Sequence, residues 1–286
     1  MTPDLAPVQV RLASMLLRHH RLAAGWTLEE AAAELACDKS KISRIETGHR
    51  RPVLREMQQL LAAYGVTGQE RQAIAALTEA ARAGWWSEYR GILPDAMVDH
   101  AMLESIADDV MVYEPQALPA FLQTYRYASA VTSADPALQT DEERRTAVLL
   151  AARRAASIRE RPYTAVTVIL GEAALRQQVG DSEAMLDQLR LLAGQAEEIP
   201  GPVTLHVVPF TASAHPALGI GPVSIMRFPD VPGIGAICQG WSDPGALVVG
   251  QSELKAAVRR FEALRVAALS PDESQQLIRK VIATLQ

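Results

Sequence analysis

The side chains best suited to a chemical role lie between Cys37 and Pro52, in the stretch CDKSKISRIETGHRRP. Lysine and arginine are concentrated there, although the whole chain has a formal net charge of -5 at pH 7. Residues 1–65 hold nine Lys and Arg against seven Asp and Glu, whereas the full chain holds 28 against 33. A confined cationic surface on an acidic chain is suited to docking on phosphates, and it argues against indiscriminate coating of polyanions.

A short helix is predicted to present these cations. Asp38 is a suitable N-cap for a helix from Lys39 to Thr47, and Gly48 follows as a stop signal. Ile42 and Ile45 have the spacing of a side that faces a core. The outward side of this helix is then formed by Lys39, Ser40, Ser43 and Arg44.

The chemistry expected of this surface is recognition of double-stranded DNA. Arg44 has the length and the donors for a bidentate contact to guanine, and Lys39 and Ser40 are expected to read or position nearby. Arginines in the following loop and helix start are expected to contact phosphates, which supply affinity and not sequence choice. The predicted DNA-binding residues are Thr27, Lys39, Ser40, Lys41, Ser43, Arg44, Arg50, Arg51 and Arg55. The alternative is a solvated structural face; the charge lies on the second helix of a tightly joined pair, which favours DNA binding.

A five-helix N-terminal bundle is predicted to hold this surface. Thr27 and Glu30 form a capping box at the start of the second helix, and Ala36-Cys37-Asp38 is the turn into the third. The predicted helices span residues 8–24, 27–35, 39–47, 54–64 and 68–83. The apolar side of the first is predicted to contain Leu12, Met15, Leu16, Leu22 and Ala23.

The remainder of the chain is predicted to form a larger α+β domain with a small sheet. We expect a helix-turn-helix domain over residues 1–83, a junction over 84–94 that contains Trp85 and Trp86, and the second domain over 95–286. Short β-rich runs bounded by Gly and Pro predict its strands, at residues 165–170, 203–210, 223–228, 234–239 and 247–249. Its helices are predicted at residues 95–113, 141–161, 172–179, 182–197, 251–268 and 271–285.

Other chemistry finds little support in the sequence. The two cysteines, Cys37 and Cys238, lie outside any C-x-x-C spacing, and the six histidines show no metal-ligand pattern. We therefore expect no metal, no cofactor and no enzymatic activity. The start of the chain lacks a secretory signal, and no run of about 18 apolar residues occurs, so a cytoplasmic location without membrane contact is expected.

The N-terminal motif also resembles a known family. Thr27-Leu28-Glu29-Glu30, followed by Ser40-Lys41-Ile42-Ser43-Arg44-Ile45-Glu46-Thr47-Gly48 and Arg50-Arg51-Pro52, resembles the helix-turn-helix of Cro/phage-repressor-like (Xre-type) regulators. The resemblance implies that the start of the third helix reads DNA. Leu28 replaces a glutamine that contacts phosphate in the family, and Ala36 occupies the position of the turn glycine. A left-handed alanine there would cost about 1 kcal/mol.

The rest of the chain is similar to the WhiJ-like regulators of actinobacteria. The similarity lies in the segments Gly84-Trp85-Trp86, Tyr113-Glu114-Pro115, Leu118 to Thr124, Glu172 to Arg176, Gln188-Leu189, Val207 to Phe210 and Ala268 to Ser270. It implies an antitoxin-like regulator whose gene often neighbours that of a small BldB-like protein.

Together these observations predict a sequence-specific transcriptional regulator that binds paired half-sites as a homodimer. The C-terminal domain is expected to receive the signal, from a BldB-like partner if the resemblance holds. The alternative is that this domain is a small-molecule sensor or a degenerate enzyme. The loop from Thr211 to Pro222, which contains His215, would then contribute to a pocket, although a solvent-exposed loop histidine is the favoured interpretation.

Overall fold

The computed structural model describes residues 8–47, 49–80, 85–161, 164–194, 203–219, 221–228, 235–240, 247–248 and 251–285. The chain divides into two compact units, formed chiefly by Met1–Glu88 and by Tyr89–Arg227 with Ala236–Gln286. We call them the N-terminal unit and the C-terminal unit. Within the described ranges, every helix is too short or too polar to cross a bilayer.

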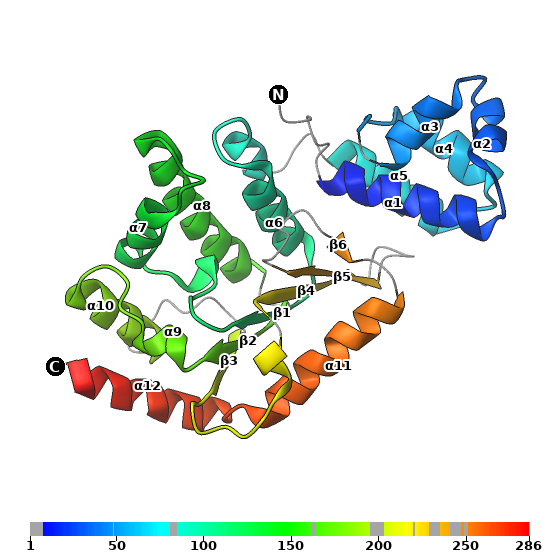
Figure 1. Ribbon diagram of the computed structural model, residues 1–286. Helices are drawn as coiled ribbons and strands as arrows, with labels where there is room; N and C mark the ends of the chain where they lie inside the picture. The colour runs from blue at the N-terminus through cyan, green and yellow to red at the C-terminus, as the bar shows by residue number, and fades with distance from the viewer. Residues whose placement is uncertain are drawn as a thin grey trace. The chain divides into compact units, whose positions relative to one another are not determined.

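The N-terminal unit contains five described α-helices, as the sequence predicts. They are α1 (Val8–Ala23), α2 (Leu28–Glu34), α3 (Lys39–Glu46), α4 (Leu54–Ala63) and α5 (Gly68–Ala80). Helix α1 packs against α3, α4 and α5, and α2 packs against α3 (Figure 1). Their shared core includes Leu12, Leu16, Ile42, Ile45, Met57 and Leu60, all of which are buried. The predicted end of the fifth helix, residues 81–83, lies outside the described residues.

The last turn of α1 departs from the predicted apolar side. Leu22 is 58% exposed and Ala23 is also exposed, so their assignment to the buried side is wrong. Arg21 is buried instead, four residues after the buried Leu17 and thus on the same face of the helix. The spacing of apolar residues does not reveal that a charged residue with a buried partner, Arg21, takes the buried position in place of Leu22.

The turn between α2 and α3 follows the local signals of the sequence. The Thr27 hydroxyl accepts the Glu30 N–H, and the Glu30 carboxylate accepts the Thr27 N–H, which confirms the capping box. Ala36 has a φ of 47°, the left-handed conformation whose cost was considered because the related family has glycine at this position. Asp38 then caps α3 by accepting the Ser40 N–H at 2.8 Å.

The C-terminal unit is built on a six-stranded mixed sheet with strand order β3-β2-β1-β4-β5-β6. The strands are β1 (Asp109–Glu114), β2 (Ala165–Gly171), β3 (Val203–Val208), β4 (Val223–Phe228), β5 (Gly235–Gly240) and β6 (Leu247–Val248). Strands β1, β2 and β3 are parallel, with Val112 opposite Val168, and Val168 opposite Leu205. Strand β4 runs antiparallel to β1, and β6 runs antiparallel to β5.

Helices cover both faces of this sheet (Figure 1). The helices are α6 (Asp95–Ile106), α7 (Tyr125–Ala134), α8 (Asp141–Arg159), α9 (Ala173–Arg176), α10 (Ser182–Leu192), α11 (Gln251–Ala267) and α12 (Pro271–Leu285). Phe261 and Leu264 of α11 pack on Met111, Tyr113 and Ile169 of the sheet. Short 3₁₀ helices span Trp85–Tyr89, Ala120–Leu122 and Pro216–Gly219. The α+β class is confirmed.

The central strand β1 lies within residues 95–113, for which the sequence pattern predicts one helix, and this prediction is wrong. Helix α6 ends at Ile106, and Asp109–Glu114 pairs with β2 on one side and with β4 on the other. Val110, Met111, Val112 and Tyr113 are all buried, because a strand in the middle of a covered sheet is buried on both faces. Such a continuous apolar run lacks the alternation that identifies a strand with one solvated face.

Two other predicted helices are shorter than expected. The segment predicted as a helix over 172–179 is helical only over Ala173–Arg176, and Gln177 is already extended. Helix α10 ends at Leu192, before the predicted end at residue 197; residues 195–197 lie outside the described residues. His215 is half-buried and not solvent-exposed as the sequence favoured, and its Nδ1 has no hydrogen-bond partner among the described atoms. A contact of His215 with a ligand stays a prediction.

Candidate nucleic-acid interface

The solvent side of α3 carries the predicted reading residues. Lys39, Ser40 and Arg44 are exposed, and Ser43 is half-buried, whereas Ile42 is fully buried on the opposite side. The Arg44 guanidinium lies back along the helix: its Nε donates to the Ser40 carbonyl and its Nη2 to the Ser40 Oγ, both at 3.2 Å. These long, exposed bonds leave donors that a base edge can compete for.

Lys39 forms an ion pair across the helix-turn-helix. Its Nζ lies 2.9 Å from Glu29 Oε1, on the first turn of α2. The two side chains are 64% and 65% exposed, so solvent screens the pair. The hydrogen bond between them lowers the pKa of Glu29 and raises the pKa of Lys39. Both groups are therefore charged at neutral pH, and the cation predicted to read DNA has a carboxylate attached to it.

Lys41 has a different environment from the rest of the set. Its Nζ lies 2.6 Å from Glu56 Oε1 of α4, and the side chains are only 19% and 21% exposed. The pair ties α3 to α4 inside the N-terminal unit. A DNA contact by Lys41 remains a prediction, and the geometry favours a structural role.

The remaining predicted contacts flank α3. Arg50 and Arg55 are exposed, and neither forms an ion pair with any described residue. The Arg51 guanidinium lies 3.5 Å from the Thr78 carbonyl of α5. Thr27 is exposed at the N-cap of α2, where its hydroxyl is already engaged in the capping box. All nine predicted residues thus belong to one unit, and five of them lie on α3.

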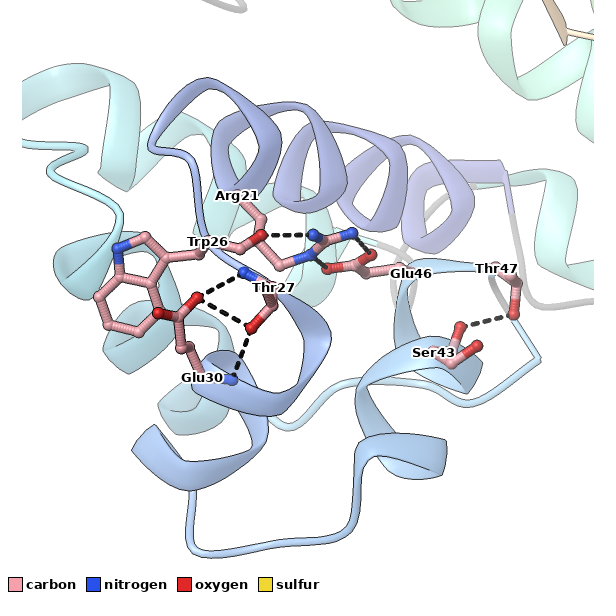
Figure 2. Close-up of polar contacts among 7 residues, drawn as sticks. All are labelled: Arg21, Trp26, Thr27, Glu30, Ser43, Glu46 and Thr47. Carbon is pink, nitrogen blue, oxygen red and sulfur yellow. Dashed lines mark hydrogen bonds and ion pairs between the residues drawn. The ribbon is translucent and has the colours of Figure 1, made fainter.

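The sequence analysis missed the group that holds α3 in place. Arg21 of α1 donates from Nε and Nη2 to the two carboxylate oxygens of Glu46, at 2.7 and 2.9 Å, and from Nη1 to the Trp26 carbonyl at 2.7 Å (Figure 2). The Arg21 and Glu46 side chains are only 8% and 3% exposed. Burial beside this pair raises the pKa of Tyr64. A signal was present: Arg21 and Glu46 fall on the same helix faces as the buried Leu17 and Ile42, four positions earlier.

The end of α3 is closed by local hydrogen bonds. The Thr47 hydroxyl donates to the Ser43 carbonyl at 2.8 Å (Figure 2). The Arg50 N–H donates to the Arg44 carbonyl at 2.9 Å. In the first bond, the backbone carbonyl of Ser43 accepts the hydroxyl of the residue that follows the last turn of α3. The second fixes where the chain leaves the helix, and so places the arginines that follow.

Metal chemistry has no built site in the described part of the chain, where no group of three or more His, Cys, Asp or Glu residues is placed to hold an ion. Cys37 is a free, partly buried thiol in the turn before α3. The solvent side of α3 offers cations and hydroxyls, which are the groups that proteins use to contact phosphates and base edges.

Comparison with protein families also divides the chain into an N-terminal and a C-terminal part. Residues 13–74 match a helix-turn-helix domain, so the N-terminal unit is a DNA-binding domain of that type. Residues 97–280, more than half of the chain, match the family described as a domain of unknown function, DUF5753. The chain belongs to this family. A search of curated proteins and a search of solved structures found no match. The DUF5753 match identifies neither the Xre-type nor the WhiJ-like group, and both remain resemblances.

Proposed function

We propose that this DUF5753 protein is a sequence-specific transcriptional regulator that reads operator DNA through α3 as a homodimer. The supporting observation is the exposed Arg44 guanidinium, which makes only long bonds to Ser40 on the solvent side of a helix whose other side is buried. A helix presented in this way enters a major groove by its N-terminal end, and the guanidinium of Arg44, a residue of the last turn of α3, lies back beside Ser40 in the first turn. Arg44 is then the side chain that can exchange its bonds to Ser40 for the N7 and O6 of guanine.

Phosphate contacts in this proposal come from the chain after α3. Arg50 and Arg55 are exposed and make no ion pair with a described carboxylate, so their charges are available to the DNA backbone. Each neutralised phosphate releases condensed counterions, and binding should therefore weaken steeply with salt. These contacts fix register, whereas Arg44 and Ser40 provide sequence choice.

The decisive experiment compares wild type with Arg44→Ala on the promoter region of the protein's own operon, by fluorescence anisotropy. We expect Arg44→Ala to weaken specific binding by roughly 1–3 kcal/mol and to leave binding to unrelated duplexes nearly unchanged. Arg145→Ala, at an exposed position of α8, is the matched control and should bind as wild type does. Equal affinities of wild type and Arg44→Ala for the promoter would exclude α3 Arg44 as the reader.

The homodimer is proposed because helix-turn-helix modules usually occupy two half-sites about one helical turn apart. Sedimentation of the protein with and without the promoter duplex tests it. Two chains per duplex are expected, with a footprint that has approximate two-fold symmetry. One chain per duplex would be compatible with DNA recognition by α3 but would contradict the proposed homodimer.

The C-terminal unit is proposed to receive the signal and to lack catalytic activity. The resemblance to WhiJ-like regulators supports a small BldB-like protein as the source of that signal, in an antitoxin-like pair. Co-purification with the product of a neighbouring small gene is the test, followed by a promoter-binding assay with and without that protein. No complex at micromolar concentration would remove the partner from the proposal.

A small-molecule signal is the second candidate, and one cavity favours it. The cavity has a volume of about 280 Å³ and lies between the start of β3, the end of α10 and the start of α12. Its lining is mostly apolar and includes Leu122, Leu192, Leu205 and Pro271. Ligand pockets usually have volumes of about 300–1,000 Å³ and a few polar groups on an apolar lining, and here Thr204 and Gln275 are the polar residues of a cavity just below that size. A thermal-shift screen of metabolites against wild type and a cavity-filling Leu205→Phe variant would separate specific from general stabilisation.

A further inference from the structure

The first turn of α2 places acidic side chains where a helix-turn-helix meets the DNA backbone. Glu29 and Glu30 are exposed there, and the first helix of such a pair crosses the phosphates while the second enters the groove. The Glu30 carboxylate accepts the N–H and the hydroxyl of Thr27, so it serves the capping box. Glu29 takes no part in the capping box; its carboxylate accepts from Lys39 on α3 and from its own backbone N–H.

We propose that Glu29 is a specificity determinant, because its ion pair with Lys39 restrains sequence-independent attraction to DNA phosphates. The inference rests on the proposed function of α3. It adds a residue whose charge disfavours binding to DNA of unrelated sequence. With the pair formed, the reading helix begins with a neutral pair of side chains in place of a free ammonium group. Attraction to any duplex is then left to the arginines after α3, and base contacts have a larger share in the choice of site.

The Lys39–Glu29 pair differs in exposure from an ion pair that stabilises helix packing. Lys41 and Glu56 form a comparable pair at 2.6 Å, but that pair is largely buried and joins two packed helices. The Lys39–Glu29 pair is about two-thirds exposed and bridges α2 and α3, which already pack through their apolar faces. Exposed pairs contribute little to folding stability. Loss of Glu29 should therefore change the electrostatics of the interface and leave the fold intact.

The expected effect follows from counterion release. A lysine freed from its carboxylate can neutralise one more phosphate, which makes the slope of log K against log salt more negative by about 0.9. Removing Glu29 also removes a negative charge that repels the backbone. At low salt we expect Glu29→Gln to bind a duplex of random sequence about three- to tenfold more tightly than wild type.

The test uses the full-length protein and a fluorescein-labelled duplex of random sequence, titrated at several salt concentrations. Glu142→Gln on α8 is the matched control, since it removes one exposed carboxylate from the C-terminal unit and changes the net charge equally. The inference requires tighter binding and a steeper salt slope in Glu29→Gln and neither effect in Glu142→Gln. Equal gains in both variants would reduce the effect to net charge and overturn it.

A double-mutant cycle supplies the second readout. Lys39→Ala leaves Glu29 unpaired beside the phosphates and should bind random duplex more weakly than wild type. The salt slope should become steeper when Glu29→Gln is introduced into wild type, and it should stay unchanged when Glu29→Gln is introduced into Lys39→Ala, because no lysine is then freed from its carboxylate. An equal change of slope in both backgrounds would show that the two residues act independently and would overturn the inference. Failure of wild type to bind any duplex at low salt would overturn the proposed function as well, whereas an unaltered Glu29→Gln overturns this inference alone.

Discussion

Arg21 holds the carboxylate of Glu46 through two hydrogen bonds, and its third donor binds the carbonyl of Trp26. One guanidinium therefore connects the end of α1, the residue before the α2 cap and the last turn of α3. The hydrogen bonds that Arg21 donates to Glu46 raise the pKa of Arg21, so the guanidinium is charged at every accessible pH. The orientation of the reading helix depends on this contact as well as on the apolar packing of Ile42 and Ile45.

Removal of one partner should destabilise the N-terminal unit strongly. Arg21→Met leaves the Glu46 carboxylate buried without its cation, and breaking such a pair costs about 3–5 kcal/mol. Hydrogen exchange of amides in residues 8–80 measures the loss. The double variant Arg21→Met/Glu46→Leu should recover much of it, because apolar residues of similar volume replace a buried pair at little cost.

Arg18→Met is the matched control on the same helix. Arg18 is exposed, and the change should leave exchange within about 0.5 kcal/mol of wild type. Similar losses in Arg18→Met and Arg21→Met would mean that α1 responds to any loss of charge, and the Arg21–Glu46 contact would have no special role.

Ala36 offers a stabilising substitution. Its φ of 47° lies in the left-handed region, which costs an L-residue roughly 1–2 kcal/mol and glycine almost nothing. After the larger chain entropy of glycine in the unfolded state is subtracted, Ala36→Gly should stabilise the unit by about 0.5–1 kcal/mol. Urea unfolding monitored by exchange measures the gain. Ala33→Gly, inside α2, should instead destabilise by about 1 kcal/mol; stabilisation by both would contradict the argument from φ.

Acid should weaken the helix starts. The carboxylates of Glu30, Glu143 and Glu273 each accept hydrogen bonds from the N-cap residue three positions earlier, which lowers the pKa of each below its ordinary value. A lowered folded-state pKa stabilises the fold above the unfolded-state pKa, about 4.3, and this contribution is lost as pH falls through the lower value. The unfolding temperature should therefore fall as the pH is lowered below about 4.5. The Glu→Gln triple variant should show a flatter profile between about pH 5 and 3; an identical slope would contradict this assignment.

Local signals in the sequence predicted the parts of the fold that depend on neighbouring residues. The Thr27–Glu30 box and the Asp38 cap each involve residues a few positions apart, and both are confirmed. Strand β1 depends on pairing with β2 and β4, more than 50 residues away, and its apolar run carries no period of its own. The fold class was therefore accessible, and the central strand was not.

The candidate site also combines features that depend on neighbouring residues with features that depend on residues far apart in the sequence. The exposure of Arg44 and the burial of Ile42 follow from helical spacing, which the sequence provides. The partners of Lys39 and Lys41 do not, because Glu29 and Glu56 come from other helices and meet α3 only after packing. The sequence therefore gives the number of cations in the candidate site, but it does not show which of them form ion pairs with carboxylates of other helices.

The covered edge of β3 provides a prediction for the C-terminal unit. β3 is an edge strand of the sheet, and its outer side is closed by the chain around the start of α12: Ser274 Oγ accepts the Val207 N–H at 2.9 Å, and the Leu269 N–H donates to the Val207 carbonyl at 2.8 Å. Ser274 is fully buried. Ser274→Ala therefore leaves a buried N–H without an acceptor, which costs about 1–3 kcal/mol.

Hydrogen exchange at the Val207 amide and thermal unfolding measure this cost together. Gln276→Ala, at an exposed position of the same helix, is the control and should alter neither quantity by more than about 0.5 kcal/mol. We expect Ser274→Ala to accelerate exchange at Val207 and to lower the unfolding temperature. If the Val207 amide stays protected in Ser274→Ala, packing of α12 alone covers the edge, since Ile278, Val281 and Ile282 remain buried on that side. The hydroxyl would then contribute only to local geometry.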